Sequence, residues 1–201
     1  MKATLRALLI VTVLVAVAAG AALYSVVRRG LSARAEPGSV EVAIARAMRL
    51  LATPSAVRHR PNPLAATEEV LDEGLEHFAD HCAVCHANDG SGDSSIGSNL
   101  YPKAPDMRAA ATQSLSDGEL FAIIENGIRL TGMPAFGDGT PEGERSSWAL
   151  VQFIRHLPAI TAQEIVRMQA LNPRTPEGFR EEEEIRRFLA GEDAHTGESP
   201  D

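Results

Sequence analysis

The stretch Cys82-Ala83-Val84-Cys85-His86 decides the fold of this chain. Its C-x-x-C-H spacing is the attachment signature of a c-type haem. Two thiols three positions apart at the end of a helix can add to the two vinyl groups of one porphyrin, and the histidine that follows can give an imidazole nitrogen to the iron. The chain has two cysteines, and both lie in the motif. We therefore predict one covalent haem c, held by Cys82 and Cys85, with His86 as an iron ligand.

Other cysteine chemistries fit the motif less well. A thioredoxin-like C-x-x-C is expected within a βαβ pattern, and no run of alternating β-branched residues surrounds this one. An iron–sulfur cluster usually takes four cysteines. Zinc could recruit His77 or His81 beside the thiolates, but a zinc site would not explain the methionine loop around Met133. We interpret His77 and His81 as partly exposed helix residues.

The methionine loop supplies a candidate second ligand to the iron. Met133 lies in Gly132-Met133-Pro134-Ala135-Phe136-Gly137, where glycine and proline bound a loop and helical amphipathicity does not place the side chain. A thioether is the usual partner of histidine on the iron of electron-transfer cytochromes. Met107 is the other loop candidate, and we predict that Met133 is the ligand.

A proline-rich segment between these two motifs is expected to wrap one edge of the haem. It reads Tyr101-Pro102-Lys103-Ala104-Pro105-Asp106. A proline carbonyl is well suited to accept the second ring N–H of a ligand histidine and so to fix its tautomer. The sequence does not choose between Pro102 and Pro105 for this role.

The charge of the chain is acidic and unevenly distributed. The 201 residues carry 19 basic and 27 acidic side chains, for a formal charge of −8. Four of the basic residues flank the first apolar stretch, so the remainder is more acidic than the whole. This balance argues against nucleic acid as a partner. It favours redox partners, donor and acceptor, that present a basic docking face.

An uncharged stretch of 21 residues, 7–27, lies between Arg6 and Arg28. At 1.5 Å per residue it is long enough to cross a hydrocarbon core of about 30 Å. A cleaved signal peptide is the alternative, but signal h-regions are about 7–15 residues long. We favour an uncleaved transmembrane anchor. Because c-type haem is attached on the outer side of an energy-transducing membrane, the C-terminal part is expected outside.

The rest of the chain reads as short helices. Residues 39–52 have apolar side chains at helical spacing, and three prolines make 53–66 an expected extended linker with an exposed His59. Gly74 within a helix costs about 1 kcal/mol relative to alanine, so we expect a close helix crossing there, with Phe153 reaching Phe78. Three further residues are expected to begin helices: Thr67 as an N-cap, and Ser116 and Thr161 through capping boxes. Apolar side chains predict a helix over 147–157. A last helix is expected around 181–189, and the final ten residues are expected to be disordered.

These signals divide the chain into four parts. We predict a transmembrane anchor (or signal peptide) over 1–29, a helix and proline-rich linker over 30–66, a haem domain over 67–158, and a helical, acidic extension over 159–201.

The segment from about Val70 to Leu157 resembles a class I c-type cytochrome, especially the single-haem domains of bacterial respiratory oxidoreductases and oxidases. The resemblance rests on Gly74, Phe78, the C-x-x-C-H motif, the Tyr101–Asp106 loop, Asn126-Gly127-Ile128, Thr131-Gly132-Met133-Pro134 and Phe153, and it covers under half of the chain. It implies an all-α cytochrome c fold of three to five helices around one covalent haem, with thioether links at Cys82 and Cys85 and with His86 and Met133 on the iron.

An iron that is bound by both histidine and methionine has no free site for substrate, so it suits one-electron transfer. No Gly-rich phosphate loop, nucleophile elbow, H-E-x-x-H or second haem motif indicates an enzyme. We expect a carrier anchored in the bacterial inner membrane with its haem domain facing the periplasm, either free-standing or a subunit of an oxidoreductase complex. A haem-based gas or redox sensor and a catalytic haem protein with a displaceable sixth ligand are the alternatives.

Overall fold

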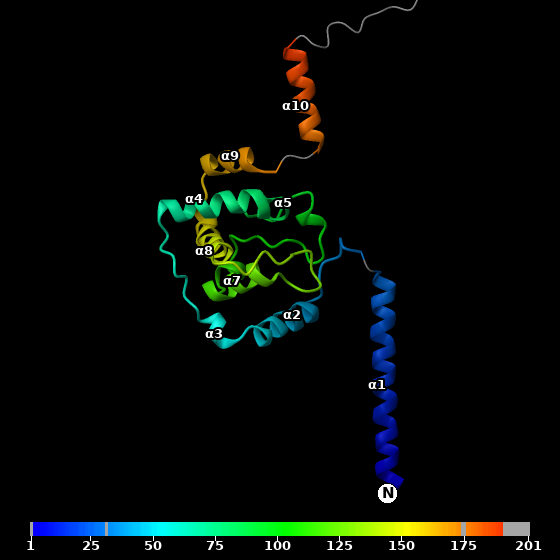
Figure 1. The fold of residues 1–201 in the computed structure, drawn as a ribbon. Helices are drawn as coiled ribbons and strands as arrows, with labels where there is room; N and C mark the ends of the chain where they lie inside the picture. The colour runs from blue at the N-terminus through cyan, green and yellow to red at the C-terminus, as the bar shows by residue number, and fades with distance from the viewer. Residues whose placement is uncertain (1, 31, 174–175, 191–201) are drawn as a thin grey trace, which may run out of the picture.

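The computed structural model describes residues 2–30, 32–173 and 176–190 (Figure 1). Within these residues the fold is built from helices and loops, and no β-strand is present, which confirms the all-α prediction. The helices in chain order are α1 (Lys2–Arg29), α2 (Ser39–Ala52), α3 (Ser55–Arg58), α4 (Glu68–His77), η1 (Phe78–Cys82), α5 (Ala83–His86), η2 (Gly97–Asn99), α6 (Ala110–Gln113), α7 (Asp117–Asn126), α8 (Pro141–His156), η3 (Leu157–Ala159), α9 (Ala162–Leu171) and α10 (Pro176–Leu189).

Helix α1 projects away from the rest of the chain (Figure 1). Its segment Thr4–Arg28 has 25 residues and a mean hydropathy of 2.5, and none of its most apolar window is buried. The helix is therefore long and apolar enough to cross a hydrocarbon core of about 30 Å. A signal sequence near an N-terminus meets the same criteria.

The core of the helical domain is organised by the crossing of α4 and α8. A Cβ atom on Gly74 would lie 2.5 Å from the carbonyl oxygen of Ala149 and 2.8 Å from Cβ of Phe153. This contact brings the ring of Phe153 to 5.3 Å from that of Phe78, centroid to centroid. Both predictions for this region, a close crossing at Gly74 and a contact between the two phenylalanines, are confirmed.

The helix that leads into the C-x-x-C-H motif is continuous but changes its winding. Thr67 caps it, because its hydroxyl accepts a 3.3 Å hydrogen bond from the backbone N–H of Val70. After α4 the chain makes the π-helical turn η1, and α5 then carries the motif to its end at His86. Ala87 leaves the helix with a φ of 58°. The π turn was not part of the sequence prediction.

The segment 53–66, predicted as an extended linker, instead contains α3 and binds along the domain. Gly118 provides room for this contact, since a side chain there would collide with the carbonyl oxygen of Val57. Asn62 donates a 2.9 Å hydrogen bond to the carbonyl of Trp148. We call residues 53–66 the strap. The exposed position predicted for His59 is confirmed.

The other helix predictions are mostly confirmed. Capping boxes form at Ser116 and Thr161, and α2 and α10 lie where helices were expected. Helix α8 is longer than predicted: it begins at Pro141 rather than Ser147, because Thr140 caps it and proline occupies its first turn. The predicted disorder of the last ten residues lies outside the described residues.

Candidate haem-binding site

The two cysteines of the motif lie on consecutive turns of one helical run, as free thiols. Cys82 packs against the hydrophobic core, whereas Cys85 is half-buried. Burial, with a smaller contribution from Cys85, raises the pKa of the Cys82 thiol to about 12, and burial also raises the pKa of Cys85.

His86 is the buried polar residue of the motif, with 8 % of its surface exposed. Burial lowers the pKa of the imidazole, and the carbonyl of Pro105 opposes this by raising it. The neutral form, which is the form that binds iron, is thus favoured at neutral pH. The Nδ1 atom is buried without a hydrogen bond of good geometry. Of the two candidate prolines, Pro105 is the one whose carbonyl lies close to the ring, while Pro102 follows a cis peptide bond.

The loop that carries Pro105 is bound closely to the motif. The N–H of Gly92 donates to the carbonyl of His86 (2.9 Å), and the N–H of Met107 donates to the carbonyl of Gly90 (2.8 Å). A Cβ on Gly97 would collide with the carbonyl oxygen of Cys85. Glycines at these positions let two loop segments lie against the end of the motif helix.

Arg108 joins the two sides of this loop. Its Nη1 atom donates to Asp89 Oδ2 at 2.8 Å, and its Nε atom donates to Asp106 Oδ1 at 2.9 Å. Asp89 follows His86 by three positions and Asp106 follows Pro105, so the guanidinium holds the proline segment against the motif. The sequence analysis missed Arg108; the available signal was an arginine two positions after an aspartate that itself follows the proline.

The methionine loop approaches the motif from another direction. Met133 is half-buried, and its carbonyl accepts a 3.2 Å hydrogen bond from the N–H of Ile128. A Cβ on Gly132 would lie 2.7 Å from the side chain of Leu100, the residue immediately before the proline-rich loop. The ring of Phe136 lies edge-on to that of His81, 6.2 Å between centroids, immediately before the motif. The loop around Met133 therefore contacts both Leu100, next to the proline-rich loop, and the motif helix.

Met107, the alternative methionine, has a different environment. It is 8 % exposed and belongs to the hydrophobic core cluster. Its carbonyl accepts a 2.7 Å hydrogen bond from the side chain of Gln113, which also donates to Ile154. These contacts give Met107 a packing role. Met133, in contrast, lies in a loop that is fixed by hydrogen bonds of its backbone.

The chemistry of these side chains fits a covalent haem. Two free thiols, a buried imidazole and a half-buried loop thioether lie in segments that contact one another. Thiols supply attachment to a porphyrin, and imidazole and thioether are ligands that suit haem iron. Within the described residues, no group of three or more histidine, cysteine or carboxylate side chains is arranged to hold a separate metal ion.

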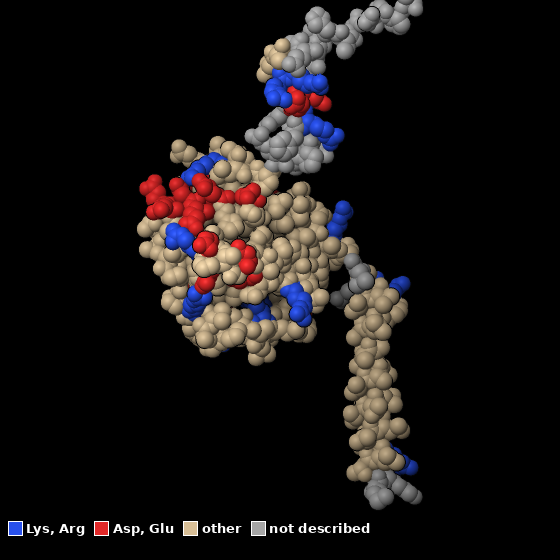
Figure 2. Space-filling model, in the orientation of Figure 1, with Lys and Arg blue, Asp and Glu red and all other residues tan. Residues whose placement is uncertain are grey.

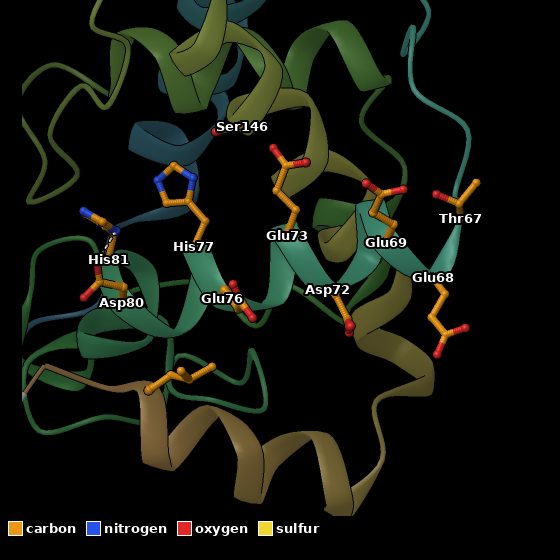
Figure 3. A pocket seen from close by; sticks show the side chains of 11 residues that line it. Thr67, Glu68, Glu69, Asp72, Glu73, Glu76, His77, Asp80, His81 and Ser146 are labelled. Carbon is orange, nitrogen blue, oxygen red and sulfur yellow. Dashed lines mark ion pairs between the residues drawn. The ribbon is translucent and has the colours of Figure 1, made fainter.

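An open groove runs along α4 (Figure 3). Carboxylates from successive turns line it, with His77 and His81 at one end. His81 forms an ion pair with Asp80 (3.2 Å), and the two imidazole rings are 4.8 Å apart. Burial, followed by the charge of His81, lowers the pKa of His77. His77 is half-buried and His81 exposed, as expected for helix histidines outside the haem site.

Comparison with known families now adds independent evidence. Residues 69–154 match the family described as cytochrome C oxidase, cbb3-type, subunit III. The match spans less than half of the chain and coincides with the α4–α8 core and both loops of the site. No curated protein sequence matches the chain significantly. With the all-helical fold and the donor set around the motif, this match identifies residues 69–154 as a class I c-type cytochrome domain with covalently bound haem c and its iron.

Proposed function

We propose that this protein is a membrane-anchored, single-haem cytochrome that carries single electrons between respiratory partners and is not itself an enzyme. The observation that carries the proposal is the buried His86 with the carbonyl of Pro105 close to its ring, in a domain where the residue before the proline-rich loop, Leu100, also packs against the loop of Met133. In this assignment Cys82 and Cys85 would hold the haem by thioether bonds, and His86 and Met133 would bind its iron.

A histidine–methionine pair determines what the site does. The haem, when bound, supplies an iron that exchanges one electron between Fe(II) and Fe(III). A soft, neutral thioether favours Fe(II) and raises the reduction potential. The role of His86 is to present a neutral imidazole in a fixed orientation, and that of Pro105 is to accept its second ring N–H. Met133 would provide the thioether ligand and so keep exogenous ligands off the iron.

The proposed anchor is α1, retained as a single membrane span. Its uncharged segment is longer than a signal-peptide core, and Tyr24 suits the interfacial end of a span. We place the helix in the bacterial inner membrane and the haem domain on the periplasmic side, because c-type haem is attached outside the cytoplasm. A family that is described as an oxidase subunit is consistent with a respiratory setting.

The surface of the domain supports protein partners with a basic docking face. Figure 2 shows acidic side chains gathered over the α4 side of the domain. An acidic surface accelerates encounter with a basic partner, in a salt-dependent way. Segments near the site also expose apolar side chains that could form short-range contacts in such an encounter: Val84, Ile96, Ile128 and Leu130.

Optical spectroscopy of the purified, haem-loaded full chain tests the ligand assignment. We expect the oxidised wild type to show the weak near-infrared sulfur-to-iron band, and the reduced form to bind carbon monoxide slowly. Met133→Ala should abolish the band and open the iron to carbon monoxide. Met107→Ala is the matched control: it removes a core methionine and is expected to cost about 2–5 kcal/mol of stability while the band survives.

Two results would contradict the proposal. Loss of the band in Met107→Ala and its survival in Met133→Ala would exchange the roles of the two methionines. A wild type that lacks the band and binds carbon monoxide at once would have an open sixth site, and gas sensing or catalysis would then replace electron transfer.

A further inference from the structure

Helix α2 exposes an apolar stripe that no described part of the protein covers. None of its residues is buried. The stripe consists of side chains that fall within one narrow arc of the helix by their spacing: Val40, Ile44, Ala47, Met48 and Leu51. The large members are well exposed, with 70 % of Val40, 64 % of Met48 and 85 % of Leu51 accessible. A continuous apolar stripe of this kind on a surface helix marks an interaction site.

The opposite side of α2 faces the domain. Val42 and Arg49, seven positions apart, are half-buried on that side. At the N-terminal end, Glu41 accepts a 2.7 Å hydrogen bond from the hydroxyl of Tyr101. Just before the helix, Glu36 pairs with Lys103 at 2.5 Å. Both partners belong to the proline-rich loop of the haem site, so α2 is held to that loop with its stripe directed outward.

The chain connects this stripe to the proposed membrane anchor over a short distance. Helix α1 ends at Arg29 and α2 begins at Ser39. The nine residues between them can span at most about 30 Å when fully extended. In Figure 1, α2 lies at the lower edge of the domain, level with the C-terminal part of α1 and crosswise to it. The stripe is therefore within reach of the surface of any membrane that α1 crosses.

The charges near the stripe fit a phospholipid surface. Arg28 ends the apolar segment and Arg34 lies exposed in the connection, so two basic residues lie where the chain would leave the membrane. Of the two carboxylates in this region, Glu36 is paired with Lys103 and Glu41 with Tyr101. Basic residues close to the end of a membrane span are attracted to an anionic membrane surface, which would draw the adjoining helix α2 toward it.

We propose that α2 lies in the membrane surface, with its apolar stripe in the boundary between phospholipid headgroups and acyl chains. The inference depends on the proposed anchoring by α1. Because α2 is bound to the proline-rich loop through Tyr101 and Lys103, its insertion would hold the haem domain in a defined orientation on the membrane. The domain would then not rotate freely on a nine-residue tether.

Site-directed spin labelling of the full, haem-loaded chain tests this inference. Three single-cysteine variants are labelled after haem attachment has consumed Cys82 and Cys85: Met48→Cys on the stripe, Arg46→Cys at an exposed position of α2 outside the stripe, and Val13→Cys in α1. Each is reconstituted at low protein density into vesicles of zwitterionic and anionic phospholipid, without added reductant and with the haem iron oxidised in all three samples. Power saturation then compares the access of apolar oxygen and of a water-soluble nickel chelate to each label.

We expect the label at position 48 to favour oxygen over the chelate severalfold more than the label at position 46. The label at position 13 should show the high access of oxygen and the low access of the chelate that are typical of the bilayer interior. A label at 13 in the bilayer with a water-exposed label at 48 would overturn the α2 inference and leave the anchor intact. A water-exposed label at 13 would overturn both. Shielding of position 48 that persists in lipid-free amphipol, together with dipolar coupling between labels, would instead assign the stripe to a second copy of the chain.

Hydrogen exchange of the backbone amides tests the same inference in the wild-type protein. Amides of residues 44–52 should exchange more slowly in anionic vesicles than in lipid-free amphipol, while those of the strap, which contacts protein in both settings, should not change. Equal exchange of residues 44–52 in the two settings would contradict membrane contact.

Discussion

Gly74 and Ala149 are in backbone contact where α4 crosses α8: a Cβ on Gly74 would lie 2.5 Å from the Ala149 carbonyl oxygen and 2.8 Å from Cβ of Phe153. Neither neighbour is the flexible end of a side chain, so the helices would have to separate. Gly74→Ala should therefore destabilise the domain by about 1–3 kcal/mol, although alanine is the better helix former by about 1 kcal/mol.

Denaturant unfolding of the haem-loaded protein measures this effect. Gly38→Ala is the matched control, because a Cβ at position 38 meets no atom within 4 Å and the residue has an ordinary φ of −68°. A stabilising effect of Gly74→Ala would show that the crossing can relax, and the role assigned to this glycine would be wrong.

The strap should contribute measurably to stability through Asn62. Its Nδ2 atom donates to the carbonyl of Trp148 and its Oδ1 atom accepts from the N–H of Leu64, both at 2.9 Å. A hydrogen bond contributes about 1 kcal/mol net, so Asn62→Ala should cost about 1–2 kcal/mol. Asn126→Ala, which removes an exposed bond to Ala122, should cost less. Limited proteolysis should also cut the strap faster in Asn62→Ala, and equal rates would argue against this role.

Features with local causes were predictable from the sequence. The capping boxes at Ser116 and Thr161 depend on residues three positions apart, and the C-x-x-C-H motif is a local chemical pattern. The close crossing at Gly74 was also predictable, because a glycine inside a helix requires a packing reason. The start of α8 had a readable signal that the analysis missed, a threonine N-cap followed by Pro141.

Features that depend on distant partners were not predictable. The prolines of the strap indicated an extended chain, but the contacts of Asn62 and Arg60 with α8 join residues more than 80 positions apart. The choice between Pro102 and Pro105 depended on which carbonyl the fold brings beside His86. No local pattern encodes either relationship, because one sequence gives no information on which distant segments meet.

Arg155 should be irreplaceable by lysine at the junction of α7 and α8. Its guanidinium donates to Asp117 Oδ1 (2.9 Å from Nε), to the carbonyl of Gln113 (2.8 Å) and to that of Leu115 (2.5 Å). An ammonium group cannot reproduce this planar fork. Arg155→Lys should therefore cost about 1–3 kcal/mol despite the retained charge. Thermal unfolding of Arg155→Lys is compared with that of Arg145→Lys, which changes a single ion pair with Glu73 at the surface. Equal melting temperatures of the two variants would contradict the structural role assigned to the Arg155 guanidinium.

We call the ion pairs of Arg108 with Asp89 and Asp106 the ionic clamp. The ionic clamp should make the stability of the domain depend on pH in the acid range. Hydrogen bonds from Arg108 lower the pKa of Asp106 below its ordinary value. Burial raises the pKa of Asp89, but hydrogen bonds from Ser91 and the charge of Arg108 outweigh this and lower it overall. Carboxylates with lowered pKa values bind fewer protons in the folded than in the unfolded state, so stability rises with pH through their titration. Their contribution is complete above about pH 4–5, near the unfolded pKa, and is lost as the pH falls through the folded values.

Urea unfolding of the haem-loaded wild type and Arg108→Gln from pH 6 to pH 3 measures this component. We expect the free-energy difference between the two proteins to be largest at pH 6 and to shrink as Asp89 and Asp106 become protonated. Arg145→Gln, which removes a guanidinium from a single exposed ion pair, should show a smaller dependence. Because His86 and the other titratable groups are common to all three proteins, their effects cancel in the differences. A difference that stays constant down to pH 3 would show that Arg108 acts through packing alone, and the ionic clamp between the proline loop and the haem motif would then be wrong.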